Sequence, residues 1–167
     1  MTPTSRRGRA PSPASAVALW TLSVVFLTRV IGQVVVEFVG VRWLPPMAEW
    51  QSGLLPYPAL LASQLVILFV MLRINLSVTR GHGFFSRPHP RLGWVLLMIA
   101  VVYAGAMAAR YVISGQLHPD RRLWPPGSIP IVFHFVLAGY LYVLSRLAGR
   151  GMHARRAISS TAPPHSD

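Results

Sequence analysis

Residues 16–38 read AVALWTLSVVFLTRVIGQVVVEF, and this stretch decides the fold class. A helix needs about 20 mostly apolar residues to cross a hydrocarbon core about 30 Å thick. The uncharged run 14–28 that precedes Arg29 is too short for this, so the span has to continue past the arginine. No small-residue cleavage site follows the run, so we expect an uncleaved transmembrane helix rather than a signal peptide.

Three further apolar stretches have the same character. They are residues 54–72, 92–113 and 129–147. We therefore predict an all-α integral membrane protein, a four-transmembrane-helix up-down bundle that occupies residues 16–149. The flanking segments 1–15 and 150–167 are polar and rich in Ser, Pro or Arg, which predicts tails outside the membrane, the second of them disordered.

The composition supports the membrane class. Only 12% of the 167 residues are charged, whereas a soluble domain carries about a quarter. The net charge of +12 comes from arginines between and beside the apolar runs. A nucleic-acid binder instead gathers basic residues on one face of a domain, so we expect no nucleic-acid partner. The absence of cysteine excludes disulfides and thiolate metal sites in this chain.

The arginines are divided unevenly between the two sides that this topology defines. One side holds eleven, namely Arg6, Arg7, Arg9, Arg73, Arg80, Arg87, Arg91, Arg146, Arg150, Arg155 and Arg156. The other holds four, Arg42, Arg110, Arg121 and Arg122, accompanied by Glu49 and Asp120. Short cytoplasmic loops are the arginine-rich ones. The pattern predicts a multi-pass protein of the plasma membrane, a bacterial inner membrane, with both termini in the cytoplasm.

Arg29, Gln33 and Glu37 follow one another at four-residue spacing on the first predicted helix. This spacing places side chains near one another along a helix surface. An arginine within the membrane is costly and usually faces the protein interior. We therefore expect Arg29 to point inward, and the spacing allows Gln33 to bridge Arg29 and Glu37.

Polar side chains on the other predicted helices lie at a similar height. They are Gln64, Tyr103, Arg110 and His134. With a rise of about 1.5 Å per residue, all of them fall in the outer half of the membrane, together with the Arg29 group. The inner half is almost bare of polar residues other than Ser and Thr. This asymmetry is the main functional indication in the sequence.

Two interpretations of these polar residues remain open. In the structural one, Arg29 and Glu37 form an ion pair, and Gln33, Gln64 and His134 join helices by hydrogen bonds. In the functional one, the residues line a cleft that opens outward and binds a lipid headgroup, a quinone or a small anion. The candidate ligand-binding residues are Arg29, Gln33, Glu37, Gln64, Tyr103, Arg110 and His134.

The sequence gives little support for a metal or cofactor site. His134 is the one histidine within a predicted span, whereas a membrane haem b is generally held by two. His134 is therefore a weak haem-ligand candidate that would need a second ligand from another chain. His82 and His89 lie in a basic loop without zinc-site spacing, and we predict no metal site.

Ala100, Ala104 and Ala108 form a small-residue stripe with Gly105 beside it. Such a stripe allows two helices to approach closely, and we expect it to pack within the chain.

Three classes of function remain at this stage. The first is a small membrane protein that holds a lipid, a quinone or an anion. The second is an accessory or anchor subunit of a respiratory or photosynthetic membrane complex, with other membrane proteins as partners. The third is a membrane enzyme with Glu37 and His134 as acid and base, although no complete catalytic set is present.

Overall fold

The computed structural model describes residues 13–50, 55–81, 84, 89–117 and 128–149. The described part is entirely helical apart from its turns: α1 (Pro13–Val39), α2 (Met47–Trp50), α3 (Tyr57–Thr79), α4 (Pro90–Leu117) and α5 (Ser128–Gly149). All but α2 are long and apolar enough to cross a membrane. The four helices predicted from the apolar runs are therefore present in the structure.

Proline marks the start of each long helix, and glycine ends two of them. Pro13, Pro58, Pro90 and Pro130 all lie in a first turn, where the missing N–H costs nothing. Gly40, directly after α1, has a φ of 64° and donates its N–H to the carbonyl of Val36. This left-handed conformation closes a helix without the steric penalty that a β-carbon would bring.

The helices extend beyond the predicted spans, most of all at the end of α3. The prediction ended this span at Leu72, before Arg73, whereas the helix continues to Thr79. Arg73 is exposed on the helix surface. Its long side chain can reach toward water while the backbone stays helical, so an arginine need not end a helix.

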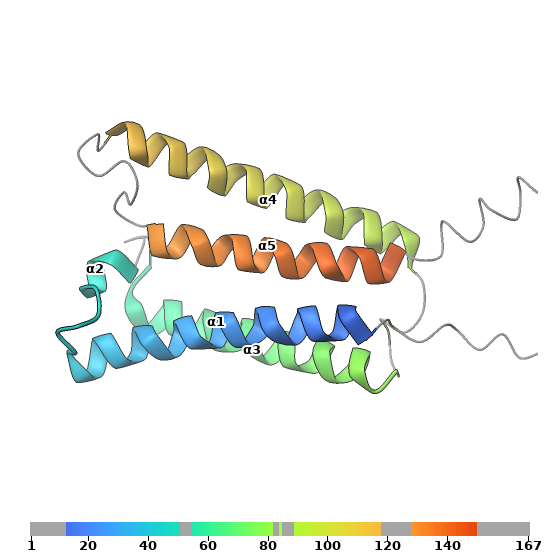
Figure 1. The fold of residues 1–167 in the computed structure, drawn as a ribbon, viewed down its shortest axis with the longest axis horizontal. Helices are drawn as coiled ribbons and strands as arrows, with labels where there is room; N and C mark the ends of the chain where they lie inside the picture. The colour runs from blue at the N-terminus through green and yellow to red at the C-terminus, as the bar shows by residue number, and fades with distance from the viewer. Residues whose placement is uncertain (1–12, 51–54, 82–83, 85–88, 118–127, 150–167) are drawn as a thin grey trace, which may run out of the picture.

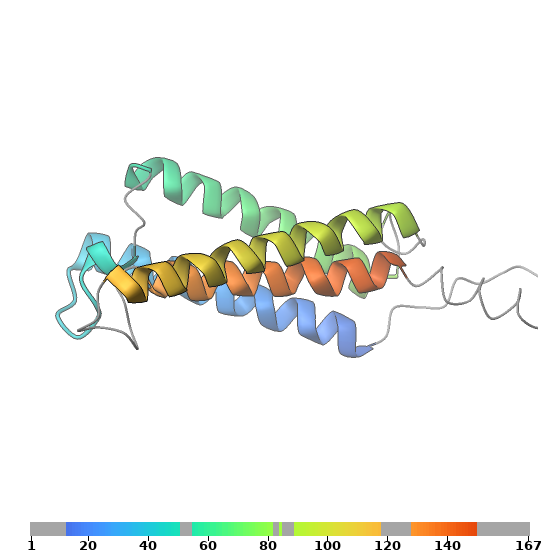
Figure 2. The same ribbon diagram turned by 90° about the horizontal axis from the view of Figure 1, so that it is seen from above.

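The four long helices alternate in direction along the chain, as Figure 1 shows. Their packing is less symmetric than that of a closed bundle, because α4 packs mainly against α5 and α3 mainly against α1. Figure 1 shows α4 on the side of α5 that faces away from α1, and Figure 2 shows the beginning of α3 diverging from the other long helices at the end of the molecule where α2 lies. The helices α1, α3 and α5 therefore form one unit, and α4 lies beside α5.

The main apolar core lies between α1, α3 and α5. Its buried members are Leu19, Phe26, Val30, Met71, Val78, Tyr140, Leu144 and Leu147. None of them comes from α4, in which Gly93 and Ala100 are the buried residues. Gly93 permits the tight contact with α5, since a β-carbon there would lie 2.7 Å from the backbone nitrogen of Gly149. The three-helix unit thus carries most of the packing, and α4 is attached to its side.

The small-residue stripe on α4 is only partly used within the chain. Ala100 is buried, as expected, but Ala108 and Gly105 are exposed. A β-carbon added at Gly105 would meet nothing within 4 Å. The expected internal packing therefore holds for one end of the stripe only, because α4 leans on α5 alone.

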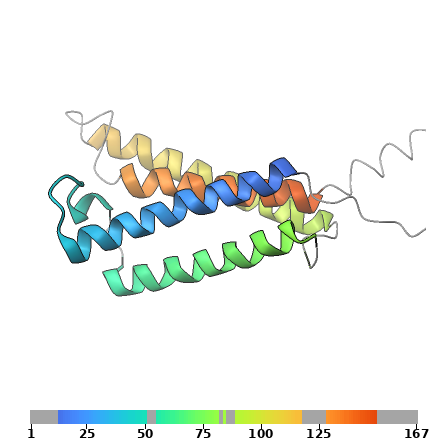
Figure 3. The same ribbon diagram turned by 60° about the horizontal axis from the view of Figure 1, so that its bottom comes forward.

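The two ends of the assembly differ in charge. The end where α1 begins and α5 ends carries Arg73, Arg80, Arg91 and Arg146, and we name it the arginine-rich end. The opposite end, which we name the α2 end, carries Arg42 and Arg110 together with the two described acids, Glu37 and Glu49. Figure 3 shows α2 in the connection between α1 and α3 at this end.

Candidate functional site

Arg29 is buried at the junction of α1, α2 and α5. Its side chain is 5% exposed, and it shares the inward face of α1 with Val30, Gln33 and Val36. The guanidinium donates a hydrogen bond of 3.3 Å to the carbonyl oxygen of Trp50 in α2. Its central carbon also lies 5.4 Å from the centre of the Phe133 ring in α5. The guanidinium of Arg29, which carries a full positive charge, therefore contacts a neutral carbonyl and an aromatic face.

The expected Arg29–Glu37 ion pair is wrong. Glu37 is exposed, and its electrostatic neighbour is Tyr57 at the start of α3. The reason is helix geometry: residues advance by about 100° each, so two steps of four residues rotate a side chain by roughly 80°. By Glu37 the predicted stripe has turned away from the core. Among the described residues no carboxylate acts on the Arg29 guanidinium, and the titratable groups near it are the Tyr103 phenol and the His134 imidazole.

Gln33 bonds to α3 rather than bridging Arg29 and Glu37. The side-chain nitrogen of Gln64 donates to the side-chain oxygen of Gln33 at 2.9 Å. The two side chains are 0% and 3% exposed, respectively. The Nε2 of Gln33, the Oε1 of Gln64 and the Nε of Arg29 have no hydrogen-bond partner. Buried polar atoms are normally paired, and these three have no hydrogen-bond partner among the described residues.

His134 and Tyr103 approach Arg29 from α5 and α4. Their ring centres lie 5.6 Å apart. The Nδ1 of His134 hydrogen-bonds the carbonyl of Pro130 in its own helix. A carbonyl only accepts, so Nδ1 carries the proton and Nε2 is the nitrogen that remains for another contact. Arg29 and Arg110 both act electrostatically on His134, which places all three in one positive region.

These contacts bring most of the predicted candidates together. We name Arg29, Gln33, Gln64, Tyr103 and His134 the Arg29 cluster. Arg110 is half-buried at its edge on α4. Glu37 lies outside it, and an acid–base pair of Glu37 and His134 has no support in the geometry. The cluster draws on all four long helices, so its assembly depends on the whole fold.

The short helix α2, which the sequence did not predict, covers the cluster. Trp50 is 8% exposed and packs with Val36 and Ile129. Its indole donates to the carbonyl of Pro45 at 3.0 Å, and its ring lies on Gly32, where a β-carbon would come within 2.8 Å. Trp50 thus forms a tryptophan cap over the α1 side of the Arg29 cluster.

A second polar network was missed in the sequence. The side-chain nitrogen of Asn75 donates to the hydroxyl of Ser23 at 2.8 Å, and the Tyr140 hydroxyl donates to the side-chain oxygen of Asn75 at 2.9 Å. The same Tyr140 hydroxyl lies 3.2 Å from the carbonyl of Met71. We name Ser23, Asn75 and Tyr140 the Asn75 network. The apolar residues around Asn75, which continue beyond Arg73, were the signal that could have revealed it.

The Asn75 network lies toward the arginine-rich end, the half of the molecule that was expected to be almost bare of polar groups other than Ser and Thr. It links α1, α3 and α5 within the main core, and Asn75 is only 1% exposed. In the part of the chain that the structure describes, no group of three or more His, Asp or Glu side chains could hold a metal ion.

Comparison of the chain with protein-family models, with curated proteins and with solved structures finds no match in any of the three. Fold and site alone therefore define the class. The chain is an all-helical protein with four helices long and apolar enough to cross a membrane. It carries a buried cationic cluster toward its α2 end.

Proposed function

We propose that this protein binds a small anionic group at Arg29 within the membrane. The observation that carries the proposal is a nearly fully buried guanidinium that has no acidic partner among the described residues and an unpaired Nε atom. Charged side chains at such depth are expensive and usually serve a function. A bound anion would neutralise the charge and accept the unused hydrogen bond.

The remaining atoms of the cluster favour a phosphate or carboxylate group. The Nε of Arg29 and the Nε2 of Gln33 are donors suited to anionic oxygens. The Oε1 of Gln64 is an acceptor, which suits a hydroxyl or a protonated phosphate oxygen. A quinone supplies acceptor oxygens but no negative charge, so it leaves Arg29 uncompensated. A free anion and the headgroup of a lipid both supply this oxyanion chemistry.

Thermal unfolding of the purified full chain in detergent tests this proposal. Phosphate and acetate are added at constant ionic strength, with chloride as the reference anion. A ligand at roughly 100 times its Kd adds about 2.7 kcal/mol of stability. We expect stabilisation in the wild type and in Arg42→Leu, whose arginine is exposed at the same end, and none in Arg29→Leu.

Native mass spectrometry of the same samples separates the two sources of the anion. A retained phospholipid that is lost in Arg29→Leu identifies a headgroup, whereas phosphate-dependent stabilisation of lipid-free protein identifies a free anion. Equal behaviour of wild type and Arg29→Leu in both measurements would refute the proposal.

We further propose that the arginine-rich end faces the cytoplasm of a bacterial cell and that the α2 end faces outward. The eleven-to-four division of arginines supports this orientation. Reporter fusions at Ser52 and Gly127 should report an external location, and a fusion at Gly83 a cytoplasmic one. An external signal at Gly83 would reverse the orientation.

A second candidate function is that of a subunit in a larger membrane complex. The exposed half of the small-residue stripe on α4, at Gly105 and Ala108, favours it, because such surfaces admit a close partner helix. Co-purification in mild detergent tests this candidate. A stoichiometric complex that is lost in Gly105→Leu but kept in Val102→Leu would support it.

A further inference from the structure

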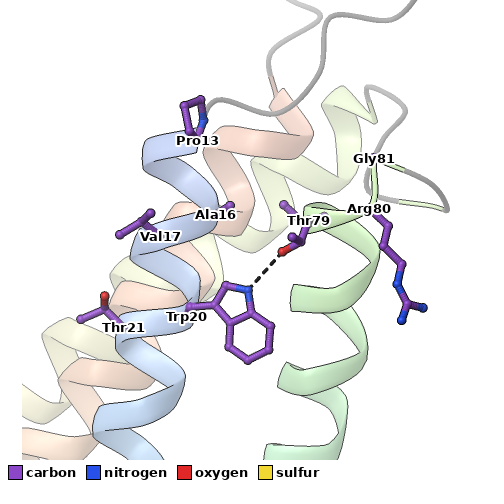
Figure 4. A pocket seen from close by; sticks show the side chains of 9 residues that line it. Pro13, Ala16, Val17, Trp20, Thr21, Thr79, Arg80 and Gly81 are labelled. Carbon is purple, nitrogen blue, oxygen red and sulfur yellow. Dashed lines mark hydrogen bonds between the residues drawn. The ribbon is translucent and has the colours of Figure 1, made fainter.

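Side-chain hydrogen bonds between α1 and α3 differ at the two ends of their contact. At the arginine-rich end the Trp20 indole donates to the Thr79 hydroxyl at 3.1 Å, as Figure 4 shows, and neither side chain has a buried polar atom without a partner. Toward the α2 end, Gln33 and Gln64 share one hydrogen bond. Each of these two amides also has one buried atom without a partner among the described residues.

The two amides together offer a ligand one donor and one acceptor. The donor is the Nε2 of Gln33, and the acceptor is the Oε1 of Gln64. If both amides turned over, the bond between them would run in the opposite direction, and the pair would again present one N–H group and one carbonyl. The pattern that the pair presents therefore does not depend on which way the amides are turned.

Arg29 and His134 extend this pattern. Arg29 lies four residues before Gln33 on the inward face of α1, and its Nε is a buried, charged donor without a partner among the described residues. The Nδ1 of His134 donates to the carbonyl of Pro130, so its Nε2 carries no proton and is an acceptor on the α5 side. The Arg29 cluster thus combines two donors, two acceptors and one positive charge.

We propose that the ligand of the anion site proposed above is a phosphate group with a single negative charge and at least one hydroxyl. Its charged oxygens accept from Arg29 and Gln33, and its hydroxyl donates to the Oε1 of Gln64. In inorganic phosphate a second hydroxyl donates to the Nε2 of His134. This inference rests on the proposed function and adds the chemical class of the anion.

The buried acceptor of the amide pair is the selective element. A carboxylate, a sulfate or a phosphate diester is fully ionised near neutral pH and has no hydroxyl on the anionic group. Such a ligand would leave the Oε1 of Gln64 buried and unpaired, which costs more than a missing hydrogen bond at the surface. Inorganic phosphate and a phosphate monoester both supply the required hydroxyl.

Thermal unfolding of the full chain in detergent compares four anions at constant ionic strength. They are inorganic phosphate, methyl phosphate, dimethyl phosphate and sulfate, at about pH 5.5, where a phosphate group is mostly singly charged. Sulfate matches phosphate in size and dimethyl phosphate matches it in charge, but neither has a hydroxyl. We expect an apparent Kd for inorganic phosphate at least about tenfold lower than for either. Methyl phosphate that binds as tightly as inorganic phosphate assigns the site to monoesters, and weaker binding assigns it to the free ion.

A double variant tests the role of the two amides. Gln33→Leu with Gln64→Leu removes both partners of their hydrogen bond, so neither amide is left buried alone. The variant should respond to anions through Arg29 but bind phosphate and sulfate equally. Asn75→Leu, which removes an amide of α3 outside the cluster, should keep the tenfold preference.

The outcomes separate this inference from the proposed function. If all four anions stabilised the wild type equally, or if the double variant kept the preference for phosphate, the assignment of the ligand would be overturned while anion binding at Arg29 would stand. If none of the four anions stabilised the wild type, both would be overturned.

Discussion

The Asn75 network and the Arg29 cluster are both buried polar groups that join α1, α3 and α5, with α4 added in the cluster, yet they differ in how fully their hydrogen-bonding groups are paired. In the Asn75 network each side chain bonds another helix or its own backbone, and none of its polar atoms is left buried without a partner. In the Arg29 cluster three buried polar atoms have no partner among the described residues, and no described carboxylate neutralises the positive charge.

This difference separates two uses of polarity inside a membrane protein. A satisfied neutral network joins helices, and its loss is felt as lost stability. An unsatisfied charged group lowers the stability of the protein when no ligand is bound, and a ligand that pairs with the charge would restore that stability. Substitutions in the two regions test this contrast. Arg29→Leu is expected to raise the free energy of unfolding, whereas Asn75→Leu is expected to lower it.

The largest effect is expected for Arg29→Leu. Removing an uncompensated buried cation should raise the free energy of unfolding of the ligand-free protein by roughly 1–4 kcal/mol. Arg29→Lys keeps the charge and should give no such gain. Chemical denaturation in detergent measures both variants. If Arg29→Leu were less stable than wild type without ligand, the cation would already be compensated.

Gly32→Ala addresses the tryptophan cap over the cluster. The new β-carbon would lie 2.8 Å from the Trp50 ring, so α2 has to shift away from α1. Overpacking of this kind costs about 1–3 kcal/mol. Gly139→Ala is the matched control, because its β-carbon would meet Leu22 at an ordinary 3.8 Å. Equal melting temperatures for the two variants would show that Trp50 is not held on Gly32.

Asn75→Leu tests the satisfied network. It removes the hydrogen bonds to Ser23 and Tyr140. Interhelical hydrogen bonds in membranes average about 0.6 kcal/mol, so we expect a loss of about 1 kcal/mol. Ser63→Ala, which removes only an exposed hydroxyl bonded within α3, should change little. A gain in stability for Asn75→Leu would remove the contrast between the two regions.

The smallest effect is expected for Glu37→Ala. Because the carboxylate is exposed and does not pair with Arg29, the free energy of unfolding should change by no more than about 0.5 kcal/mol. Anion-dependent stabilisation should also be retained. A loss of several kcal/mol in the free energy of unfolding would show that Glu37 does pair with Arg29, as in the structural interpretation of the sequence.

The sequence indicated the burial of Arg29 but did not indicate the Asn75 network. Arg29 was expected to face inward because a charge at that depth cannot favourably face lipid, and it does so. Asn75 was overlooked because Arg73 was taken to end the span, although an exposed arginine does not interrupt a helix. Glu37 was placed wrongly because a four-residue repeat drifts around the helix, and this drift accumulates over two steps.

The sequence by itself determined the helical class, the four long apolar helices and the burial of Arg29. These follow from the lengths of apolar runs and from the cost of a charge in hydrocarbon, which are properties of single segments. The tertiary structure alone decided what Arg29 meets: the carbonyl of Trp50, the ring of Phe133 and, among the described residues, no carboxylate. Those contacts depend on how each helix is rotated about its axis and on which helices are neighbours. Both are set by packing between segments distant in the chain, and hydropathy carries little information about either.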